Sequence, residues 1–151
     1  MDNINGERFK VFSGSHLLLI KNNKLLLSRR KNTNFDDGKY ALIAGHLDGG
    51  ETLRETACRE ALEEVGIKIH PDDLIPLHIL HKKDPIREYV VVFFSVKKWE
   101  NEPKNMEPEK CYEINWFDTD NLPEDTSDLM KATIPKILKG ELYSEFGWDI
   151  K

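Results

Sequence analysis

The sequence contains few of the features that define several large classes of protein. Its 151 residues include two cysteines, Cys58 and Cys111, which are too few for a disulfide scaffold. Neither these cysteines nor the five histidines stand at zinc-ligand spacing. The longest apolar run, YVVVFF at 89–94, is much shorter than a membrane span. We therefore expect no membrane partner and no fold that depends on disulfides.

The chain as a whole has fewer basic than acidic residues, and its first ten residues are mostly polar. The first ten residues, MDNINGERFK, lack the apolar stretch of a signal peptide, so we expect a cytoplasmic location. Lys and Arg number 22 against 27 Asp and Glu, which gives a net charge of −5. Proteins that bind a nucleic-acid polymer usually carry a basic surface, so we expect no such partner. A small phosphorylated substrate remains compatible, because a few local cations and a metal ion can hold it.

The length and the apolar pattern predict one domain spanning residues 1–151. Apolar runs predict strands at residues 15–20, 24–30, 40–44, 75–81, 87–99 and 111–117, the first two joined as a hairpin at Asn22-Asn23. A terminal helix is expected over 127–138, with Ser127 as its N-cap and a kink or new turn at Pro135. With one central helix, this order is typical of an α+β fold or a mixed-sheet α/β sandwich.

The central helix lies in the segment GHLDGGETLRETACREALEEVGI, residues 45–67, which contains six acidic residues. Thr52 and Glu55 have the spacing of a capping box, in which each side chain hydrogen-bonds the other residue's backbone. Gly66 is a typical helix stop. These signals predict a helix from Leu53 to Val65.

Helical winding places an apolar stripe beside an acidic arc formed by Glu60, Glu63 and Glu64. The expected core stripe is Ala57, Cys58, Ala61, Leu62 and Val65. Like charges at this spacing cost roughly a few tenths of a kcal/mol per pair. One interpretation is a solvated acidic face. The other is a site for a hard cation such as Mg²⁺ or Mn²⁺, which prefers carboxylate oxygens and would imply phosphate chemistry.

The spacing within this segment favours the second interpretation. Gly45, Glu51 and the run REALEEVGI at 59–67 match the pattern G-x5-E-x7-R-E-U-x-E-E-x-G-U, where U is a bulky apolar residue. Only Ala61 is small for its position. The segment therefore resembles the signature of the Nudix hydrolases. This resemblance implies a Nudix-like α/β/α sandwich with a mixed β-sheet. It also implies Mg²⁺- or Mn²⁺-dependent hydrolysis of a nucleoside diphosphate linked to another moiety.

The resemblance also implies roles for individual residues. It assigns as metal ligands the carboxylates of Glu60, Glu63 and Glu64 and the backbone carbonyl of Ala44. Glu63 or Glu64 is expected to assist the deprotonation of water, and Arg59 to orient the carboxylates by ion pairing. Glu51 is expected to brace the loop against the helix without touching metal. His46 either faces the phosphates or is an ordinary loop residue.

Residues outside the signature are expected to complete the site. Family members often supply a further acid from a loop before a late strand, so Glu107 is a candidate ligand or base, with Glu109 second; both are otherwise exposed loop carboxylates. Arg29 and Arg30 point to opposite faces of their strand, and similarity to MutT-type members favours Arg30 as the phosphate contact.

The base-binding residues are less well defined by the sequence. Stacking against an aromatic ring tolerates any base, and the aromatic candidates are Phe35, Tyr40, Trp116 and Phe117. The resemblance implies edge contacts to the base from the turn near Leu122-Pro123, because this turn lines the pocket in family members; Asp118 is the candidate, and Asp120, Asp125 and Thr126 are alternatives.

The leading hypothesis is a Mg²⁺-dependent hydrolase that releases pyrophosphate and a nucleoside monophosphate from a nucleoside triphosphate. An alternative substrate is ADP-ribose, a nucleotide sugar or a dinucleoside polyphosphate. A third hypothesis, a non-catalytic nucleotide-binding regulator on the same fold, fits less well with the intact set of three glutamates. The oligomeric state stays open, with a homodimer as one alternative.

Overall fold

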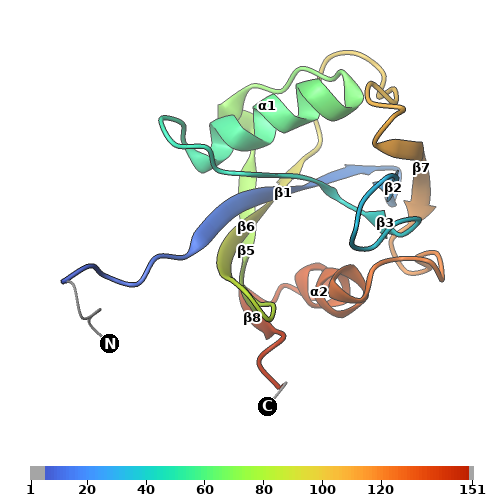
Figure 1. The fold of residues 1–151 in the computed structure, drawn as a ribbon. Helices are drawn as coiled ribbons and strands as arrows, with labels where there is room; N and C mark the ends of the chain where they lie inside the picture. Colours follow the sequence, from blue (N-terminus) through green and yellow to red (C-terminus); the bar gives the residue numbers. More distant parts are fainter. Residues whose placement is uncertain (1–5, 150–151) are drawn as a thin grey trace.

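The computed structural model describes residues 6–149, which form a mixed β-sheet with one helix on each side (Figure 1). The strands are β1 (Phe12–Lys21), β2 (Lys24–Arg30), β3 (Tyr40–Ala41), β4 (Ile43–His46), β5 (Ile75–Lys83), β6 (Glu88–Val96), β7 (Cys111–Asp118) and β8 (Tyr143–Phe146). The helices are α1 (Leu53–Val65), α2 (Asp128–Leu138) and the short 3-10 turn η1 (Pro71–Asp73). The predicted α/β/α sandwich is confirmed.

The sheet divides along β1, and this division creates the site. The strand order is β3-β2-β1-β6-β5-β8, with β4 paired to β1 and β7 paired to β2. β1 pairs with β4 through Gly14–Leu17, and with β2 only through Ile20 and Lys21. One branch of the sheet therefore carries β4, and the other carries β2, β3 and β7. Residues of both branches line the cavity described below.

Local turn chemistry explains why the first hairpin was predicted correctly. Asn22 and Asn23 have φ values of 53° and 60°, the left-handed conformation that a tight two-residue hairpin needs. The single strand expected over 40–44 was wrong, because the chain breaks at Leu42 into β3 and β4. Leu42 is buried, and the two strands pair with different partners, β2 and β1.

Three further sequence expectations need correction. β8 was missed, since four residues give too short an alternation to detect. β6 ends at Val96 and does not continue to residue 99. Pro135 does not interrupt α2, whose Ser127 N-cap is confirmed; Met130, Ile134 and Ile137 are buried on both sides of the proline and hold the helix in place. Within residues 6–149, no helix is long and apolar enough to cross a membrane.

The core lies in two layers, one on each side of the sheet. The layer under α1 contains Leu17, Leu19, Leu26, Ile43, Ala57, Ala61, Val65, Ile67, Ile69, Leu74, Phe94 and Val96. The layer under α2 contains Leu18, Leu25, Leu27, Tyr40, Leu42, Leu80, Tyr89, Val91, Phe93, Met130, Ile134 and Ile137. Successive residues of β1 therefore alternate between the two layers, as the pleat of a strand requires.

α1 has the predicted ends but a different rotation about its axis. Thr52 and Glu55 form the capping box, and Gly66 ends the helix with a φ of 70°. The buried residues are Thr56, Ala57, Ala61 and Val65. Cys58 is partly buried and packs against the core layer under α1, whereas Leu62 is 56% exposed, so the assignment of Leu62 to the core stripe was wrong. The buried face is centred closer to Glu60 and Glu64, which turns these two carboxylates toward the sheet.

Candidate active site

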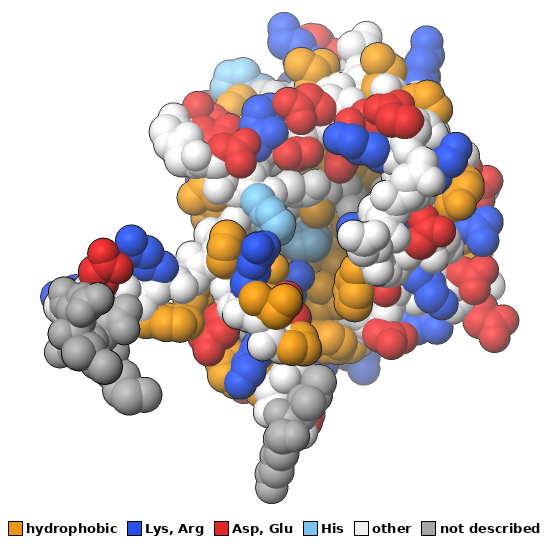
Figure 2. Space-filling view, viewed as in Figure 1, with side chains coloured by type: hydrophobic (Ala, Val, Ile, Leu, Met, Phe, Trp, Pro, Cys, Tyr) orange, Lys and Arg blue, Asp and Glu red, His pale blue; other side chains and the backbone are white. Residues whose placement is uncertain are grey.

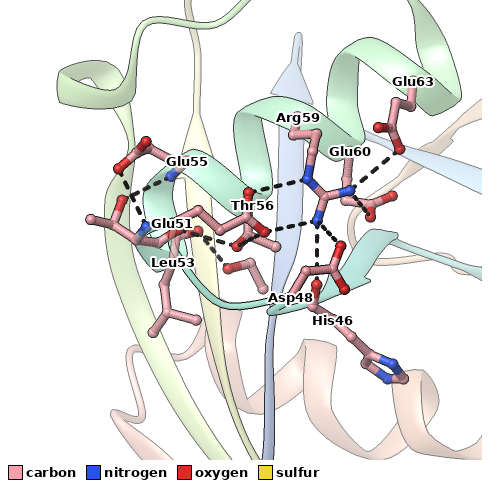
Figure 3. A network of polar contacts seen from close by, with 11 residues as sticks. His46, Asp48, Glu51, Leu53, Glu55, Thr56, Arg59, Glu60 and Glu63 are labelled. Atoms are coloured by element: carbon pink, nitrogen blue, oxygen red, sulfur yellow. Dashed lines mark hydrogen bonds and ion pairs between the residues drawn. The ribbon is translucent and has the colours of Figure 1, made fainter.

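Arg59 is the centre of a polar network that joins α1 to the glycine-rich loop before it (Figure 3). Its Nε and Nη2 donate to the two carboxylate oxygens of Glu51, at 3.1 and 2.9 Å. Its Nη1 donates to Glu60 at 2.9 Å and to Glu63 at 3.4 Å. A two-point contact of this kind fixes the guanidinium plane. The expected ion pairing of Arg59 with the glutamates is therefore present, and its catalytic role remains a prediction.

Glu51 braces the loop against the helix, as its place in the signature implied. Besides the contacts with Arg59, it accepts a hydrogen bond from the buried Thr56 hydroxyl at 2.9 Å. Arg59, and after it Thr56, lower the pKa of Glu51 from 4.5 to about 2, although partial burial opposes this shift. The network thus prefers the ionised form of Glu51.

We expect the stabilising effect of Glu51 to disappear in acid. A carboxylate whose pKa is depressed on folding stabilises the protein above its unfolded pKa, and this stabilisation is lost as pH falls from about 4.5 to about 2. Glu51→Gln should therefore have a lower melting temperature than wild type at pH 7. This difference in melting temperature should become smaller as the pH falls toward 2. Thermal melts of both proteins across this range test the idea. A gap that stays constant or widens in acid would contradict it.

Glu60 reaches the sheet through the space that Gly45 leaves open. A Cβ on Gly45 would collide with the Glu60 carboxylate, so only glycine fits beside this side chain. Burial raises the pKa of Glu60, and this effect exceeds the opposite effect of the charge and hydrogen bond of Arg59. The first glycine of the signature therefore has a steric role, because it allows a carboxylate on α1 to lie against β4.

Glu64 is the most unusual side chain of the site. Its Oε2 is buried and has no hydrogen-bond partner within residues 6–149. Burial, and after it the charges of Glu60 and Glu107, raise the pKa of Glu64 from 4.5 to about 8. A buried and unpartnered carboxylate oxygen is costly. Such an atom is expected where a ligand, such as a cation, completes the site.

Glu107 is held near the other two carboxylates by the loop that carries it. Met106 N–H donates to the Glu64 carbonyl at 3.0 Å, and Lys104 N–H donates to the Val65 carbonyl at 2.9 Å, so the loop is fastened to the end of α1. The Glu107 charge raises the pKa of both Glu60 and Glu64. Glu107 also has an ion pair with Lys110 at 3.4 Å. The structure therefore brings Glu60, Glu64 and Glu107 together from two segments.

A cavity of about 190 Å³ opens beside this group, between the two branches of the sheet. Its lining includes Arg30, Ala44, Glu64, Glu107 and Lys110, together with Ser28, Thr33, Ala41, Leu42, Val65, Cys111 and Ile114. This volume is smaller than most small-molecule sites, which span about 300–1,000 Å³. The cavity is thus suited to part of a nucleotide, and it offers both carboxylates and cations to it.

The donor set fits a hard divalent cation, although the side chains are not arranged around one. Within the described part of the chain, no group of three His, Cys, Asp or Glu side chains stands at ligating distance of a common point. Arg59 occupies oxygens of Glu60 and Glu63, and like-charged carboxylates repel one another without a cation between them. The donors are nevertheless all oxygen atoms, and one of them, Glu64 Oε2, has no partner. This set suits Mg²⁺ or Mn²⁺.

Three other predicted site residues, Glu63, Phe35 and Asp118, do not line the cavity. The Glu63 side chain is 54% exposed and contacts Arg59 on the outer side of α1. Phe35 is 74% exposed in the loop before β3 and does not line the cavity. Asp118 pairs with Lys24 at the far end of β7, about 23 Å along the strand from Cys111. The structure does not bring Phe35 or Asp118 to Glu64, so their role in binding a base stays a prediction.

Sequence reasoning overlooked two polar side chains near the site, His16 and Lys82. His16 lies between Ala44 and Phe93 in the sheet, and Lys82 is near the end of β5. Burial, and after it the charges of Lys82, His46 and Arg30, lower the pKa of His16 to about 3. His16 directly precedes the apolar run Leu17–Ile20 of β1, which gives no sign that its side chain is partly buried. Lys82 gave none, because lysine at a strand end is ordinary.

Comparison with known proteins identifies the family. Residues 14–137 match the NUDIX domain family. The chain is 32% identical over 107 residues to a protein named NAD-capped RNA hydrolase NudC from Stutzerimonas stutzeri (strain A1501), which is 71% of this chain and 36% of the relative. It is 33% identical over 107 residues to an ADP-ribose pyrophosphatase from Methanocaldococcus jannaschii, covering 71% of this chain and 62% of the relative. The chain thus spans less than two thirds of either relative.

Solved structures agree on the fold. The MutT NUDIX hydrolase from Burkholderia pseudomallei superimposes with a TM-score of 0.76 at 22% identity, covering 84% of this chain and 98% of that one. The MutT protein from Bacillus halodurans gives a TM-score of 0.72 at 18% identity, covering 93% and 94%. The match over residues 14–137 shows that the chain belongs to the NUDIX family, and its acidic helix carries the family signature.

Proposed function

We propose that the protein is a Mg²⁺- or Mn²⁺-dependent hydrolase that cleaves the phosphoanhydride linkage of a nucleoside triphosphate and releases pyrophosphate and a nucleoside monophosphate. The observation that carries the proposal is Glu64, whose buried Oε2 has no partner and whose neighbours are Glu60 and Glu107. A solvated acidic face would not place a carboxylate oxygen out of contact with water. The NUDIX match supports hydrolysis of a diphosphate linkage.

Each side chain of the site has a physical task in this proposal. Glu60, Glu63 and Glu64, with the Ala44 carbonyl, would hold the ion, which neutralises phosphate charge and acidifies water when bound. Arg59 keeps the Glu60 carboxylate in place. Arg30 lines the cavity and can bind a phosphate oxygen.

A carboxylate of the site that does not bind the ion through both oxygens is free to accept a proton from water. A general base works best when its pKa is near the working pH. Glu64 has such a pKa in the metal-free protein, although a bound cation would lower it. Glu107 lines the same cavity. We propose Glu107 as the base if Glu64 binds the ion, and Glu63 or Glu64 otherwise.

A second substrate class is supported by the names of the relatives. One is called an ADP-ribose pyrophosphatase and another an NAD-capped RNA hydrolase. In ADP-ribose the diphosphate joins adenosine to a ribose, and in an NAD cap it joins two nucleosides, so in both substrates the diphosphate is linked at both ends. The same set of carboxylates could act on such a linkage. This second proposal therefore differs in the substrate, while the reaction is still hydrolysis of a phosphoanhydride bond.

A nucleotide panel with separated products tests the proposal. Nucleoside triphosphates, ADP-ribose, nucleotide sugars, dinucleoside polyphosphates and NAD-capped RNA are incubated with the protein and Mg²⁺, and products are separated by chromatography. Pyrophosphate from triphosphates is the expected result. Turnover confined to ADP-ribose or to capped RNA would replace the triphosphate with that substrate. Binding without turnover across the panel would show a nucleotide-binding regulator.

The same panel, repeated with other ions, tests the role of metal. We expect turnover with Mg²⁺ or Mn²⁺ and inhibition by Ca²⁺, which is larger and tolerates irregular geometry. Exhaustive chelation should abolish turnover and leave the melting temperature nearly unchanged, because the two core layers contain no ionisable carboxylate. Full activity after chelation would end the proposal.

A further inference from the structure

The loop that carries Glu107, residues 101–110, is restrained by hydrogen bonds although it forms neither helix nor strand. Figure 1 shows this Glu107 loop in yellow to orange beside the end of α1. The backbone carbonyls of four consecutive residues accept hydrogen bonds: Pro108 from Lys31 Nζ at 3.3 Å, Glu109 from Asn32 Nδ2 at 2.9 Å, Lys110 from the Lys31 N–H at 2.9 Å and Cys111 from Asn105 Nδ2 at 2.8 Å. A surface loop can leave such groups to water, so these contacts restrain the loop more than exposure requires.

Asn105 makes two of the contacts that shape the loop. Its Oδ1 accepts a hydrogen bond from the Glu107 N–H at 3.1 Å, and its Nδ2 donates to the Cys111 carbonyl at 2.8 Å. The first contact is the two-residue turn that asparagine favours. The second needs a donor on the same side chain, which ionised aspartate lacks. Asn105 therefore fixes the backbone of Glu107 relative to the first residue of β7.

Two further contacts hold the turn that follows Glu107. Lys110 N–H donates to the Glu107 carbonyl at 2.8 Å and closes a turn with Pro108 at its second position, where proline is favoured. Asn32 follows β2 with a left-handed φ of 56°, and its side chain donates to the Glu109 carbonyl. Together with its bonds to the end of α1, the Glu107 loop is held by three different elements.

Glu107 has a physical reason to leave the cavity when no cation is bound. It lines the same cavity as Glu64, and two carboxylates there repel one another whenever both are ionised. Its ion pair with Lys110, at 3.4 Å, restrains it little, because the Lys110 side chain is 71% exposed. Figure 2 shows acidic and basic side chains close together along the row over α1. The hydrogen bonds to the loop backbone are therefore what keep Glu107 at the cavity.

We propose that Asn105 is a positioning residue, which holds the Glu107 carboxylate at the cavity through the loop backbone before the ion and the substrate bind. Asn32 supports the same loop from the end of β2. The effect on catalysis rests on the proposed function, in which Glu107 is a base or a ligand of the ion, whereas the restraint on the loop does not. A group that is already in place needs no rearrangement during the reaction, and this lowers the barrier.

Amide hydrogen exchange of the metal-free protein tests the restraint without any turnover. The amides of Glu107 and Lys110 should exchange slowly in wild type, because both donate hydrogen bonds inside the loop. Asn105→Ala should speed their exchange roughly 10–100-fold, since the loop then opens more often. Asn115→Ala is the matched control and should leave both rates unchanged. Asn115 also accepts a backbone N–H, from Trp116 at 2.9 Å, but it lies farther along β7.

Initial rates over a range of Mg²⁺ concentrations test the effect on catalysis. If Glu107 is the base, Asn105→Ala should lower kcat roughly 10–100-fold, because a displacement of about 1 Å can cost about this much. If Glu107 is a ligand, the same variant should raise the Mg²⁺ concentration required for half of the maximal rate. Asn105→Ser keeps an oxygen for the Glu107 N–H and should recover part of the loss. The melting temperature should fall only slightly, since residues 101–110 belong to neither core layer.

A double-mutant cycle shows whether Asn105 acts through Glu107. Glu107→Gln alone should lower kcat/KM roughly 10²–10⁴-fold. Adding Asn105→Ala should then cost less than about twofold, because the group that it positions is already gone. Additive losses would mean that Asn105 serves stability or another contact, and would overturn the proposal. Unchanged amide exchange in Asn105→Ala would also overturn it, as would faster exchange with a wild-type kcat and Mg²⁺ requirement. Faster exchange in a protein that hydrolyses no nucleotide would support the restraint on the loop and reject the proposed function.

Discussion

Glu64→Gln should abolish nearly all turnover and leave the metal-free protein at least as stable as wild type. Glutamine has almost the same shape and helix propensity, but it carries no charge. The buried Oε2 has no partner in the absence of a ligand, so removing its charge relieves a desolvation cost at pH 8. In the reaction, the ion loses an anionic ligand where phosphate charge is being neutralised. We expect kcat to fall roughly 10²–10⁴-fold.

The combination of the two effects is what distinguishes a metal site from a charged surface. Initial rates in Mg²⁺ and thermal melts after chelation are measured on the same preparations. Glu124→Gln is the matched control, since Glu124 is exposed in the loop before α2, and it should change neither quantity. Near wild-type turnover of Glu64→Gln on the true substrate would mean that the acidic arc of α1 is only a solvated face.

The limits of α1 could be predicted from sequence because they depend on local chemistry. Thr52, Glu55 and Gly66 act within one turn of the helix end, so the structure reproduces Leu53–Val65 as expected. Its rotation could not be predicted in the same way. Residue type alone puts Leu62 in the core and Thr56 outside, but Thr56 finds a hydrogen-bond partner in Glu51 and is buried.

The signature located the acidic side chains of α1 without showing how each is oriented. Its fixed spacing identified Glu60, Glu63 and Glu64, because all three lie on one helix. It could not show that Glu60 and Glu64 turn inward while Glu63 stays outside. His16 and Lys82 come from β1 and β5, which are brought together only through β6. Such a pairing between distant segments leaves no local pattern, so the positions of these two side chains could be recognised only in the structure.

Gly45→Ala should inactivate the enzyme by moving one carboxylate, without unfolding the protein. The added Cβ would occupy the space of the Glu60 carboxyl group. Because Glu60 is a flexible side chain, it can swing away, and the hydrogen bond from Arg59 Nη1, now 2.9 Å, would be lost. We expect kcat/KM to fall roughly 10²-fold or more, as for the loss of one positioned charged group. The melting temperature should change little, since the backbone at Gly45 has no positive φ that would strain an alanine.

A double-mutant cycle with Glu60→Asp shows whether the steric contact is the cause. Aspartate is one methylene shorter, so it needs less of the space that the alanine fills. If the two residues act through this contact, their effects on kcat/KM will not add, and Glu60→Asp will cost much less in the Gly45→Ala protein than in wild type. Rates are measured over a range of Mg²⁺ concentrations, since a displaced ligand should also raise the amount of metal required. Additive losses, or a Gly45→Ala protein with wild-type rates and metal dependence, would mean that Glu60 does not hold the ion from its place against β4.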